Sequence, residues 1–319
     1  MAWLVTGGAG YIGSHVVHAF RQAGIPVVVI DDLSSGFAGF VPSDVPLYRG
    51  SLLDAELVGR AFAEHPVTGV VHLAGFKYAG VSVERPLHTY QQNVTATVAL
   101  LTAMAGAAVE RIVFSSSAAV YGTPGVDLVT EDTPTSPESP YGRTKLIGEW
   151  LMKDQAVATG LQHTSLRYFN VVGSGQPQLY DSSPHNLFPL VFDALLAGRT
   201  PRVNGVDYAT RDGSCERDYV HVTDIARAHV AAARALAGGT ALEPVYNLGS
   251  GTGATVLEIM STVAEVTGID FTPELGPRRP GDPDRIVASG ALAQRDLDWR
   301  MRHSLAEMVA SAWQARRHA

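Results

Sequence analysis

Short apolar runs alternate with longer segments of helical periodicity through the first half of the chain. Buried β-strands are predicted at residues 3–5, 27–30, 70–73, 112–114 and 165–168. Helices are predicted between them, at residues 11–23, 54–64, 86–105 and 140–159. Strands that alternate with helices are typical of a parallel sheet covered by helices on both faces. The pattern therefore predicts an α/β fold with a doubly wound parallel sheet.

The pattern changes after about residue 170, where Gly, Pro, Ser and Asn become frequent over residues 173–186. A helical pattern returns at residues 225–236 and a strand pattern at residues 245–248. We therefore expect a larger domain at residues 1–170, with a returning segment at about 215–250. A smaller mixed α/β lobe is expected at residues 171–214 and 251–319.

The composition is that of a folded protein of 319 residues, with 46% hydrophobic and 17% charged residues. The net charge is −7 and the 24 Lys and Arg residues are scattered, which argues against nucleic-acid and anionic-membrane surfaces. No run of about 18 apolar residues and no signal peptide is seen, so we expect a cytoplasmic protein. Cys215 is the single cysteine and the 11 His residues show no metal-ligand spacing, so no metal site is predicted.

A glycine-rich turn directly follows the first predicted strand. Its sequence, TGGAGYIGS at residues 6–14, fits the G-x-G-x-x-G pattern and opens a predicted helix. Glycines there permit a tight turn and let backbone N–H groups approach a pyrophosphate at the helix N-terminus. The strand before and the helix after it indicate a Rossmann-type dinucleotide site.

Two acidic residues end the second predicted strand. Asp31 is placed to accept hydrogen bonds from the adenosine ribose hydroxyls. Asp31 and Asp32 together would repel a 2′-phosphate, and no arginine follows closely. NAD is therefore predicted as the cofactor in preference to NADP.

Tyr141 and Lys145 lie one helical turn apart at the start of the helix predicted at 140–159. Ser139 is suited to cap that helix and Pro140 to its first position. A cation at about 5 Å, with an effective dielectric of about 20, favours a phenolate by roughly 3 kcal/mol, or about two pKa units. The pair is thus predicted to act as a base near neutral pH. The competing interpretation is that the two residues are ordinary surface side chains of a helix. The predicted dinucleotide-binding fold disfavours that interpretation.

Three consecutive serines follow the predicted strand at 112–114. In a doubly wound sheet, the C-terminal ends of the strands line the ligand crevice. We expect at least one hydroxyl among Ser115, Ser116 and Ser117 to relay a proton between substrate and tyrosine, although the sequence does not say which.

At this point the chain resembles the extended short-chain dehydrogenase/reductase family, and within it the nucleotide-sugar 4-epimerases that act on UDP-galactose and UDP-glucose. The resemblance runs from residue 2 to about residue 313. It is carried by TGGAGYIGSH at 6–15, HLAGFKYAGVSV at 72–83, FSSSAAVYG at 114–122, SPYGRTK at 139–145, LRYFNVVG at 166–173, RDYVHV at 217–222, YNLGSG at 246–251 and PRRPGD at 277–282.

The resemblance implies NAD-dependent 4-epimerisation of a UDP-hexose through a 4-keto sugar, with NAD retained through each turnover. Tyr141 would be the base, Lys145 the ribose-binding cation that lowers the tyrosine pKa, and Ser117 the proton relay. The implied NAD contacts are Gly7, Gly10, Tyr11, Ile12, Gly13, Asp31, Asp32, Ser51, Leu52, Leu73, Ala74, Gly75, Lys77, Asn93, Ser115, Tyr141, Lys145 and Tyr168. The implied UDP-sugar contacts, centred on the smaller lobe, are Ser117, Tyr141, Asn170, Asn186, Leu187, Arg217, Tyr219, Arg279 and Asp282.

Three departures from the family pattern bear on binding. Ser51 stands where the family usually has an aspartate that touches adenine, so a weaker contact is expected there, with Leu52 beside it. Val81 replaces a glutamate that many epimerases have. Ile286 occupies a position at which preference for acetamido sugars is often tuned. These departures leave open whether the sugar is a hexose, an N-acetylhexosamine or a pentose.

Three other functions compete with epimerisation. A 4,6-dehydratase needs an Asp-Glu pair after the catalytic Ser or Thr, and this chain has Ala118 and Ala119 there. A net dehydrogenase would release NADH and has no need of a diphosphate anchor such as PRRPGD. A non-catalytic NAD sensor has no reason to keep Tyr141, Lys145 and Ser117 together. Relatives imply a homodimer through helices near 86–105 and 150–157, whose apolar faces could equally belong to the core.

Overall fold

The computed structural model describes residues 1–279 and 282–318, and its centre is a seven-stranded sheet. The strand order is β11-β6-β5-β4-β1-β2-β3, and every neighbouring pair is parallel. The strands are β1 (Ala2–Thr6), β2 (Val27–Asp31), β3 (Leu47–Arg49), β4 (Val67–His72), β5 (Arg111–Ser115), β6 (Gln162–Tyr168) and β11 (Val245–Leu248). This confirms the predicted doubly wound fold. β11 belongs to the segment expected to return to the sheet.

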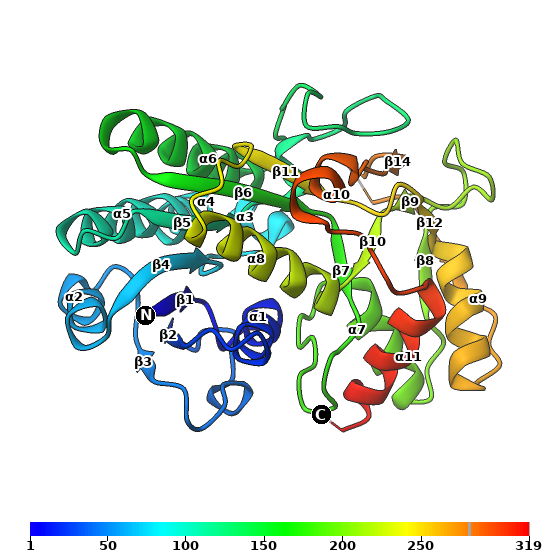
Figure 1. Ribbon diagram of the computed structural model, residues 1–319. Helices are drawn as coiled ribbons and strands as arrows, with labels where there is room; N and C mark the ends of the chain where they lie inside the picture. The colour runs from blue at the N-terminus through cyan, green and yellow to red at the C-terminus, as the bar shows by residue number, and fades with distance from the viewer. Residues whose placement is uncertain (280–281, 319) are drawn as a thin grey trace.

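Helices cover both faces of the sheet (Figure 1). One face packs against α1 (Tyr11–Gln22) and α8 (Val222–Ala237), and the other against α2 (Ala55–Glu64), α5 (Ala96–Gly106) and α6 (Pro140–Thr159). Successive strand residues divide between the two cores, since Val5 lies in the first and Leu4 in the second. This alternation follows from the two-residue period of a strand. It explains why the central strands appear as continuous apolar runs.

The prediction of one continuous helix at residues 86–105 is wrong. The structure has α4 (Pro86–Tyr90), a π-helical turn η2 (Gln91–Thr95) and α5 in succession. A further short helix, α3 (Ala79–Glu84), precedes them. The π-helical turn contains Asn93, whose side-chain amide bonds to the Phe76 backbone and to Thr144. Such turns are common at functional sites, and these contacts explain the break in the helix.

A smaller lobe is built from short elements that come from distant parts of the chain. Its main core joins α7 (Leu187–Leu196), α9 (Val256–Thr267) and α11 (Leu305–Arg316), which gather on the right of Figure 1. Its strands form small sheets, namely β7 (Asn170–Val172) with β10 (Tyr219–His221), β8 (Arg202–Asn204) with β13 (Glu274–Gly276), and β9 (Glu216–Arg217) between β12 (Ala254–Thr255) and β14 (Arg285–Ile286). Short elements also include η1 (Ala38–Phe40), η3 (Ala118–Val120) and α10 (Ala291–Leu297).

One segment expected in the smaller lobe packs on the larger domain instead. Ala293 and Leu297 of α10, and Trp299 after it, lie in the core between the sheet and α1 and α8. The indole N–H of Trp299 donates to the Asp224 carbonyl of α8 at 2.7 Å. The chain thus returns to the sheet a second time before α11.

The described residues form neither a membrane-spanning helix nor a metal-binding cluster. None of the helices there combines the length and the apolar character that a membrane crossing requires. No group of three or more His, Cys, Asp or Glu residues within 1–279 and 282–318 is arranged to hold a metal ion.

Candidate active site at the carboxyl ends of the strands

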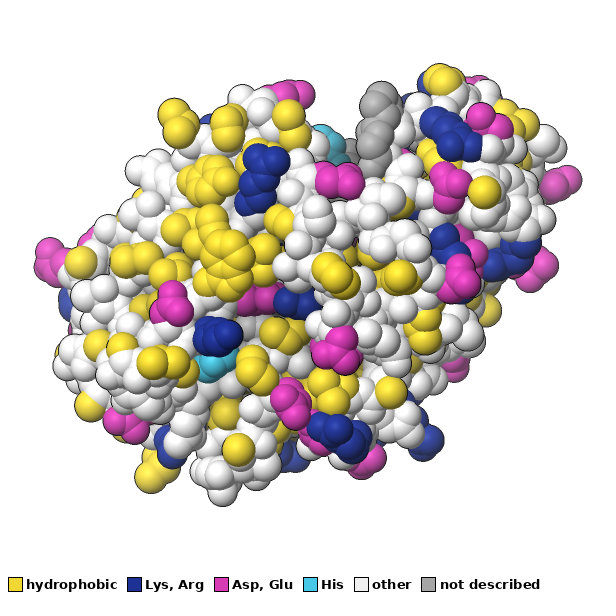
Figure 2. Space-filling view, turned by 90° about the horizontal axis from the view of Figure 1, so that it is seen from above, with side chains coloured by type: hydrophobic (Ala, Val, Ile, Leu, Met, Phe, Trp, Pro, Cys, Tyr) yellow, Lys and Arg dark blue, Asp and Glu magenta, His cyan; other side chains and the backbone are white. Residues whose placement is uncertain are grey.

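The carboxyl ends of β1, β4, β5 and β6 meet at one edge of the sheet, where the smaller lobe adjoins it. They lead to the glycine turn, to Leu73, to the serine run and to Phe169, respectively. Seen from above, a hollow with acidic and basic side chains lies between the larger and the smaller part of the molecule (Figure 2). In parallel sheets this edge is where ligands bind.

The glycine turn is packed too closely for side chains at two positions. Gly7 has φ of 72°, and a Cβ there would lie 2.8 Å from the Ala74 backbone nitrogen. A Cβ on Gly13 would lie 2.0 Å from the Gly7 carbonyl oxygen. The sequence thus brings the start of α1 against the end of β1, and only glycine fits at both points.

The same turn fits a dinucleotide. The N-cap of α1 is Gly10, and no side chain bonds to the first N–H groups of this helix. Uncapped N–H groups at a helix N-terminus are free to bind phosphate oxygens. Asp31 accepts from the Ala9 and Leu33 N–H groups at 2.9 and 2.8 Å, and burial raises the pKa of its carboxyl group. This places the carboxylate beside the turn, as expected for a ribose contact.

The remaining predicted NAD contacts surround this turn. Tyr11 and Ile12 begin α1, and the Tyr11 hydroxyl donates to the Gly173 carbonyl at 2.6 Å. Ser51 is partly exposed, whereas Leu52 is buried in the core against α2 and α5. The contact that the sequence left to Leu52 therefore has little side-chain surface available. The other members are Asp32, whose carboxylate accepts from Ser34, and Ala74, Gly75, Lys77 and Asn93 on and behind the loop after β4.

Tyr141 lies in the first turn of α6, as the sequence predicted. Ser139 caps the helix by accepting from the Gly142 N–H at 3.1 Å, and Pro140 occupies the first helical position. Burial raises the pKa of the Tyr141 hydroxyl above its ordinary value, and the Ser117 hydroxyl acts more weakly in the opposite direction. The direction is opposite to the one expected from sequence. The protein by itself therefore holds Tyr141 as a neutral phenol.

Lys145 is buried beneath the tyrosine. Its Nζ donates to the Ser115 carbonyl at 2.8 Å and lies 5.9 Å from the centroid of the Tyr141 ring. Burial lowers the pKa of Lys145 to about 8, and the Glu149 carboxylate acts against that shift. The ammonium group thus stays charged at neutral pH.

The three serines point to different partners. The Ser115 hydroxyl bonds to His229 of α8 at 2.8 Å, and the Ser116 hydroxyl donates to Glu149 at 2.5 Å. Ser117 is the one of the three that acts on Tyr141, because its hydroxyl lowers the pKa of the tyrosine. The run therefore divides into two structural hydroxyls and one that faces the candidate base.

The predicted UDP-sugar residues come from the smaller lobe and its junction with the sheet. Arg217 lies on β9, and its guanidinium is 3.7 Å from an Asp282 carboxylate oxygen. Arg279 donates to the side-chain oxygen of Asn204 at 3.1 and 3.2 Å, in the amide orientation that satisfies both groups. The two arginines and Asp282 retain exposed surface. Planar guanidinium groups of this kind suit a diphosphate.

Four more predicted substrate residues lie at element ends. Asn170 begins β7 and its amide donates to the Asp218 carbonyl at 3.2 Å. Asn186 is the N-cap of α7 and donates to Asp181 at 2.7 Å, with Leu187 directly after it. Tyr219 on β10 is buried among the lobe's aromatic residues, and burial raises the pKa of its hydroxyl.

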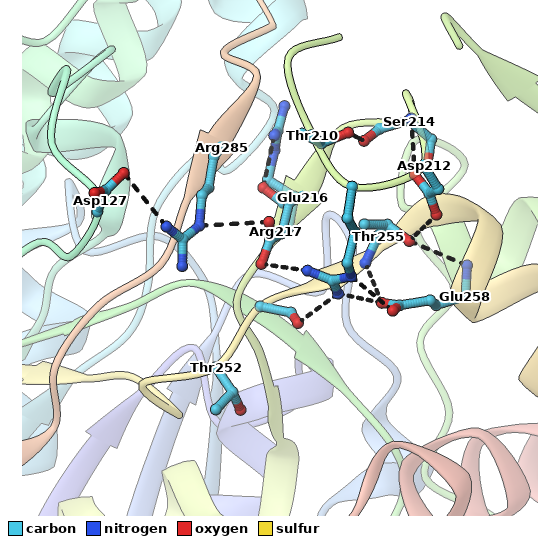
Figure 3. Close-up of polar contacts among 12 residues, drawn as sticks. Asp127, Thr210, Asp212, Ser214, Glu216, Arg217, Thr252, Thr255, Glu258 and Arg285 are labelled. Carbon is cyan, nitrogen blue, oxygen red and sulfur yellow. Dashed lines mark hydrogen bonds and ion pairs between the residues drawn. The ribbon is translucent and has the colours of Figure 1, made fainter.

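Behind Arg217, a network of ion pairs holds β9 in place (Figure 3). Glu216 lies 3.4 Å from Arg285 of β14 and 2.9 Å from Arg211. Arg211 in turn donates to Glu258 of α9 at 2.7 Å. Arg285 also pairs with Asp127 at 3.5 Å. The two-residue strand that carries Arg217 is thus held through Glu216 by two arginines, each of which is paired with a further acidic residue.

Several residues near the site escaped the sequence interpretation. His72 accepts or donates between Thr6 and Thr97 at 2.8 Å each, and His229 supports Ser115. Glu149 and Arg167 form a buried ion pair beside Lys145. Glu149 follows Lys145 by four residues, and that spacing was a signal available in the sequence. The position of His72 depends on strand pairing and that of His229 on the packing of α8 against the sheet, neither of which a local pattern reveals.

Comparison with known proteins places the chain among nucleotide-sugar enzymes. It is 44% identical over 305 residues to the UDP-glucose 4-epimerase of Azospirillum brasilense, covering 94% of this chain and 87% of the relative. It is 43% identical to that of Halalkalibacterium halodurans, covering 98% and 95%. Among solved structures, the UDP-glucose 4-epimerase of Bifidobacterium longum in complex with NAD⁺ and UDP has a TM-score of 0.91 at 34% identity, covering 100% of this chain and 98% of that one.

The family itself follows from a match over most of the chain. Residues 3–249 match the NAD dependent epimerase/dehydratase family. This confirms the resemblance seen in the sequence, the expected enzyme class and NAD as the cofactor. The chain belongs to the NAD dependent epimerase/dehydratase family.

Proposed function

We propose that this protein interconverts UDP-galactose and UDP-glucose by epimerisation at C4 of the sugar. The observation that carries the proposal is the position of Tyr141 in the first turn of α6, with the Lys145 ammonium 5.9 Å from the centroid of its ring, beside a turn that fits NAD. The relatives named UDP-glucose 4-epimerase support the same reaction.

In this proposal Tyr141 removes the proton of the C4 hydroxyl, directly or through Ser117. NAD, when bound, supplies the hydride chemistry by accepting hydride from C4 and returning it to the opposite face. Tyr141 then gives the proton back to the same oxygen. General acid–base groups of this kind contribute about 10²–10⁴-fold to a rate.

Lys145 is the group that makes the tyrosine a usable base. Burial raises the pKa of Tyr141, so the phenolate needs a nearby positive charge. The Lys145 ammonium lies 5.9 Å from the ring centroid, and the N-terminus of α6 adds a favourable dipole. The lysine hydrogen bond to the Ser115 carbonyl leaves its other N–H groups free to bind a ribose hydroxyl.

The smaller lobe would hold UDP while the sugar turns over. Arg217 and Arg279 supply two forked cations for the diphosphate, and Asp282 can accept from the uridine ribose. The other proposed substrate contacts lie at the starts of β7, α7 and β10, and they are Asn170, Asn186, Leu187 and Tyr219. An anchor on the nucleotide lets the keto sugar present either face without leaving the site.

Elimination of water is disfavoured at this site. A dehydratase would need an acid and a base after Ser117, and Ala118 and Ala119 form the turn η3 there. An alanine has no group that transfers a proton. A net dehydrogenase and an NAD sensor remain the functions against which the experiment below discriminates.

The choice of sugar is proposed from Ile286. Its side chain is buried with Val120, Tyr121 and Ala288 in a small apolar cluster. A branched, packed side chain leaves less room than a flexible one for an acetamido group. We therefore propose hexoses as the preferred substrates.

We also propose a cytoplasmic homodimer. Large apolar side chains are exposed on the outer helices, with Leu87 at 85%, Trp150 at 55% and Val157 at 85%. The first belongs to α4 and the other two to α6, the helices expected to pair. Exposed apolar patches of this kind commonly mark an interface.

The function is tested by proton NMR of UDP-galactose mixed with purified protein. Growth of UDP-glucose to a constant ratio without added NAD supports the epimerase and a retained cofactor. Conversion only with added NAD supports the reaction but not retention. If UDP-galactose is not converted in either case but UDP-N-acetylgalactosamine or a UDP-pentose is, the proposed substrate is wrong and that sugar takes its place. If NADH accumulates with any of these sugars, the enzyme is a net dehydrogenase and not an epimerase.

A further inference from the structure

A buried ion pair lies directly beneath the candidate lysine. Glu149 of α6 and Arg167 of β6 have side chains that are only 7% and 6% exposed. Arg167 donates to both carboxylate oxygens, from Nε at 2.8 Å and from a terminal nitrogen at 2.5 Å. Burying two charges is costly, and apolar residues of similar size would commonly give an equal or greater stability. The pair therefore calls for a reason other than stability.

The contacts around the pair hold the carboxylate in one position. The Ser116 hydroxyl donates to Glu149 from the end of β5. The remaining Arg167 nitrogen donates to the Tyr121 hydroxyl at 2.7 Å, and Tyr121 donates to Asn247 of β11 at 2.8 Å. The Glu149 carboxylate is thus held in one orientation by Ser116 at the end of β5 and Arg167 on β6.

Glu149 is also the charged group that acts on Lys145. It lies one helical turn after the lysine, on the same face of α6. Burial pushes the pKa of Lys145 down to about 8, and Glu149 is the group that opposes this. The Arg167 cation is the other charge of this cluster and is paired with Glu149 itself. The Ser115 carbonyl and the Phe114 and Tyr141 rings, which also lie near the ammonium, are uncharged. His72 of β4 is neutral as well, because burial and Lys145 lower its pKa to about 3.

We propose that Glu149 is a positioning residue of the reaction, which keeps the Lys145 ammonium charged while Arg167 holds the carboxylate in place. The inference rests on the proposed function, because it assigns the lysine charge a use in stabilising the Tyr141 phenolate. The Glu149 carboxylate is bonded to Ser116 and Arg167, so its effect on Tyr141 is exerted through Lys145.

The sign of the effect follows from the charges. Removing the carboxylate lets burial lower the Lys145 pKa further, so the lysine loses its proton at a lower pH. A neutral lysine no longer stabilises the phenolate, and Tyr141 then keeps its proton to a higher pH. The two pKa values move further apart, so the fraction of the protein with a charged lysine and an ionised tyrosine becomes smaller at every pH.

The experiment compares three variants of the NAD-loaded protein. Glu149→Gln removes the charge and keeps the shape, but it leaves Arg167 buried without its partner. Glu149→Leu with Arg167→Met removes both charges and should fold even if the single variant does not. Asp154→Asn removes one negative charge from the exposed side of the same helix and is the matched control. Each is measured for turnover between pH 6 and pH 10 and for tyrosinate absorbance during titration, with the Tyr141→Phe spectrum subtracted.

We expect the alkaline limb of the turnover profile to move down by about one pH unit, with about a tenfold loss above pH 8. The Michaelis constant for the UDP-sugar should change little. The tyrosinate signal of Tyr141 should appear at higher pH in both Glu149 variants and not in Asp154→Asn.

Two results would overturn the inference. One is lower turnover with unmoved pH limbs and an unmoved tyrosinate titration, which makes Glu149 purely structural. The other is full recovery of the profile in the double variant, which makes the unpaired arginine the cause. The absorbance titration reports on Tyr141 even if the protein proves not to be a 4-epimerase, so failure of the proposed function is separately visible.

Discussion

The two sides of the candidate site are built in different ways. On the sheet side, Tyr141 and Lys145 lie on a helix of 20 residues that packs on a seven-stranded sheet. On the lobe side, Arg217 lies on a strand of two residues whose position depends on ion pairs through Glu216. Proton transfer requires the more precise geometry, whereas a flexible diphosphate tolerates adjustment. The comparison suggests that the sheet side sets the chemical step and the lobe side sets binding.

The largest effect is expected at the base. Tyr141→Phe removes the group that exchanges the proton, so turnover should fall by at least about a hundredfold. The packing of α6 is kept, so bound NAD and thermal stability should stay unchanged. The loss is measured by NMR of UDP-galactose conversion in reactions quenched at fixed times. Tyr48→Phe, on the edge strand β3, is the control and should keep the wild-type rate. Turnover near the wild-type rate would move the chemistry away from the sheet side.

The glycine turn should be almost as sensitive, but through folding and NAD retention. Gly13→Ala places a methyl group 2.0 Å from the Gly7 carbonyl oxygen, so β1 and α1 must separate. We expect a loss of about 3 kcal/mol in the free energy of unfolding, at the upper end for an overpacked core. Gly59→Ala in α2 meets nothing within 4 Å and should be neutral or slightly stabilising. Denaturant unfolding compares the two, and equal stability would show that the turn has room to relax.

On the lobe side, the expected change is in binding. Arg217→Met removes a charge-assisted contact to the diphosphate, which is typically worth about 1.5–3 kcal/mol. The Michaelis constant for UDP-sugar should rise about tenfold or more, with a much smaller change in the turnover number. Arg234→Met on α8 is the control, since Arg234 bonds only to the Ala23 carbonyl at an exposed site. If the turnover number falls and the Michaelis constant is unchanged, the lobe side takes part in the chemical step and not in binding alone.

The same contrast explains what could be predicted from the sequence. The strands and helices of the sheet follow local apolar periodicity, so residues 140–159 and 245–248 were predicted with the bounds that the structure has. The glycine turn, Tyr141 and Lys145 could be found because their chemistry depends on short spacings. The break at η2 could not, because it depends on contacts from Asn93 to Phe76 and Thr144, which are 17 and 51 residues away. The pairing of Glu149 with Arg167 depends likewise on the packing of α6 against β6.

The burial of Tyr141 is what local reasoning missed. Lys145 was expected to favour a phenolate by about two pKa units, with a nicotinamide ring and the helix N-terminus acting in the same direction. Burial of the hydroxyl costs more than that spacing suggests and raises the pKa instead. The depth of a side chain is a property of the whole fold, and a four-residue interval does not contain it.

The smallest expected effect is the contribution of a buried histidine on the sheet side to the pH dependence of the free energy of unfolding. His229 is fully buried, and burial lowers its pKa to about 4 from an ordinary value of 6.5. As the pH falls, the unfolded chain takes up a proton that the folded protein refuses, so the free energy of unfolding decreases. The loss between pH 7 and pH 6 is about 0.7 kcal/mol for one such histidine. Asp218, whose pKa burial raises to about 6, acts in the opposite direction and more weakly.

Denaturant unfolding of His229→Gln at the two pH values measures this term, because glutamine can still accept from Ser115 but does not titrate. The variant can be less stable at both pH values, so the difference between them is the quantity that matters. We expect that difference to shrink by about 0.7 kcal/mol relative to the unsubstituted protein. His185→Gln, at an exposed position before α7, should leave it unchanged. If the variant has the same pH dependence as the unsubstituted protein, His229 takes up its proton inside the fold. The Ser115–His229 hydrogen bond, which lies beside the Ser115 carbonyl that accepts from Lys145, would then carry a charge.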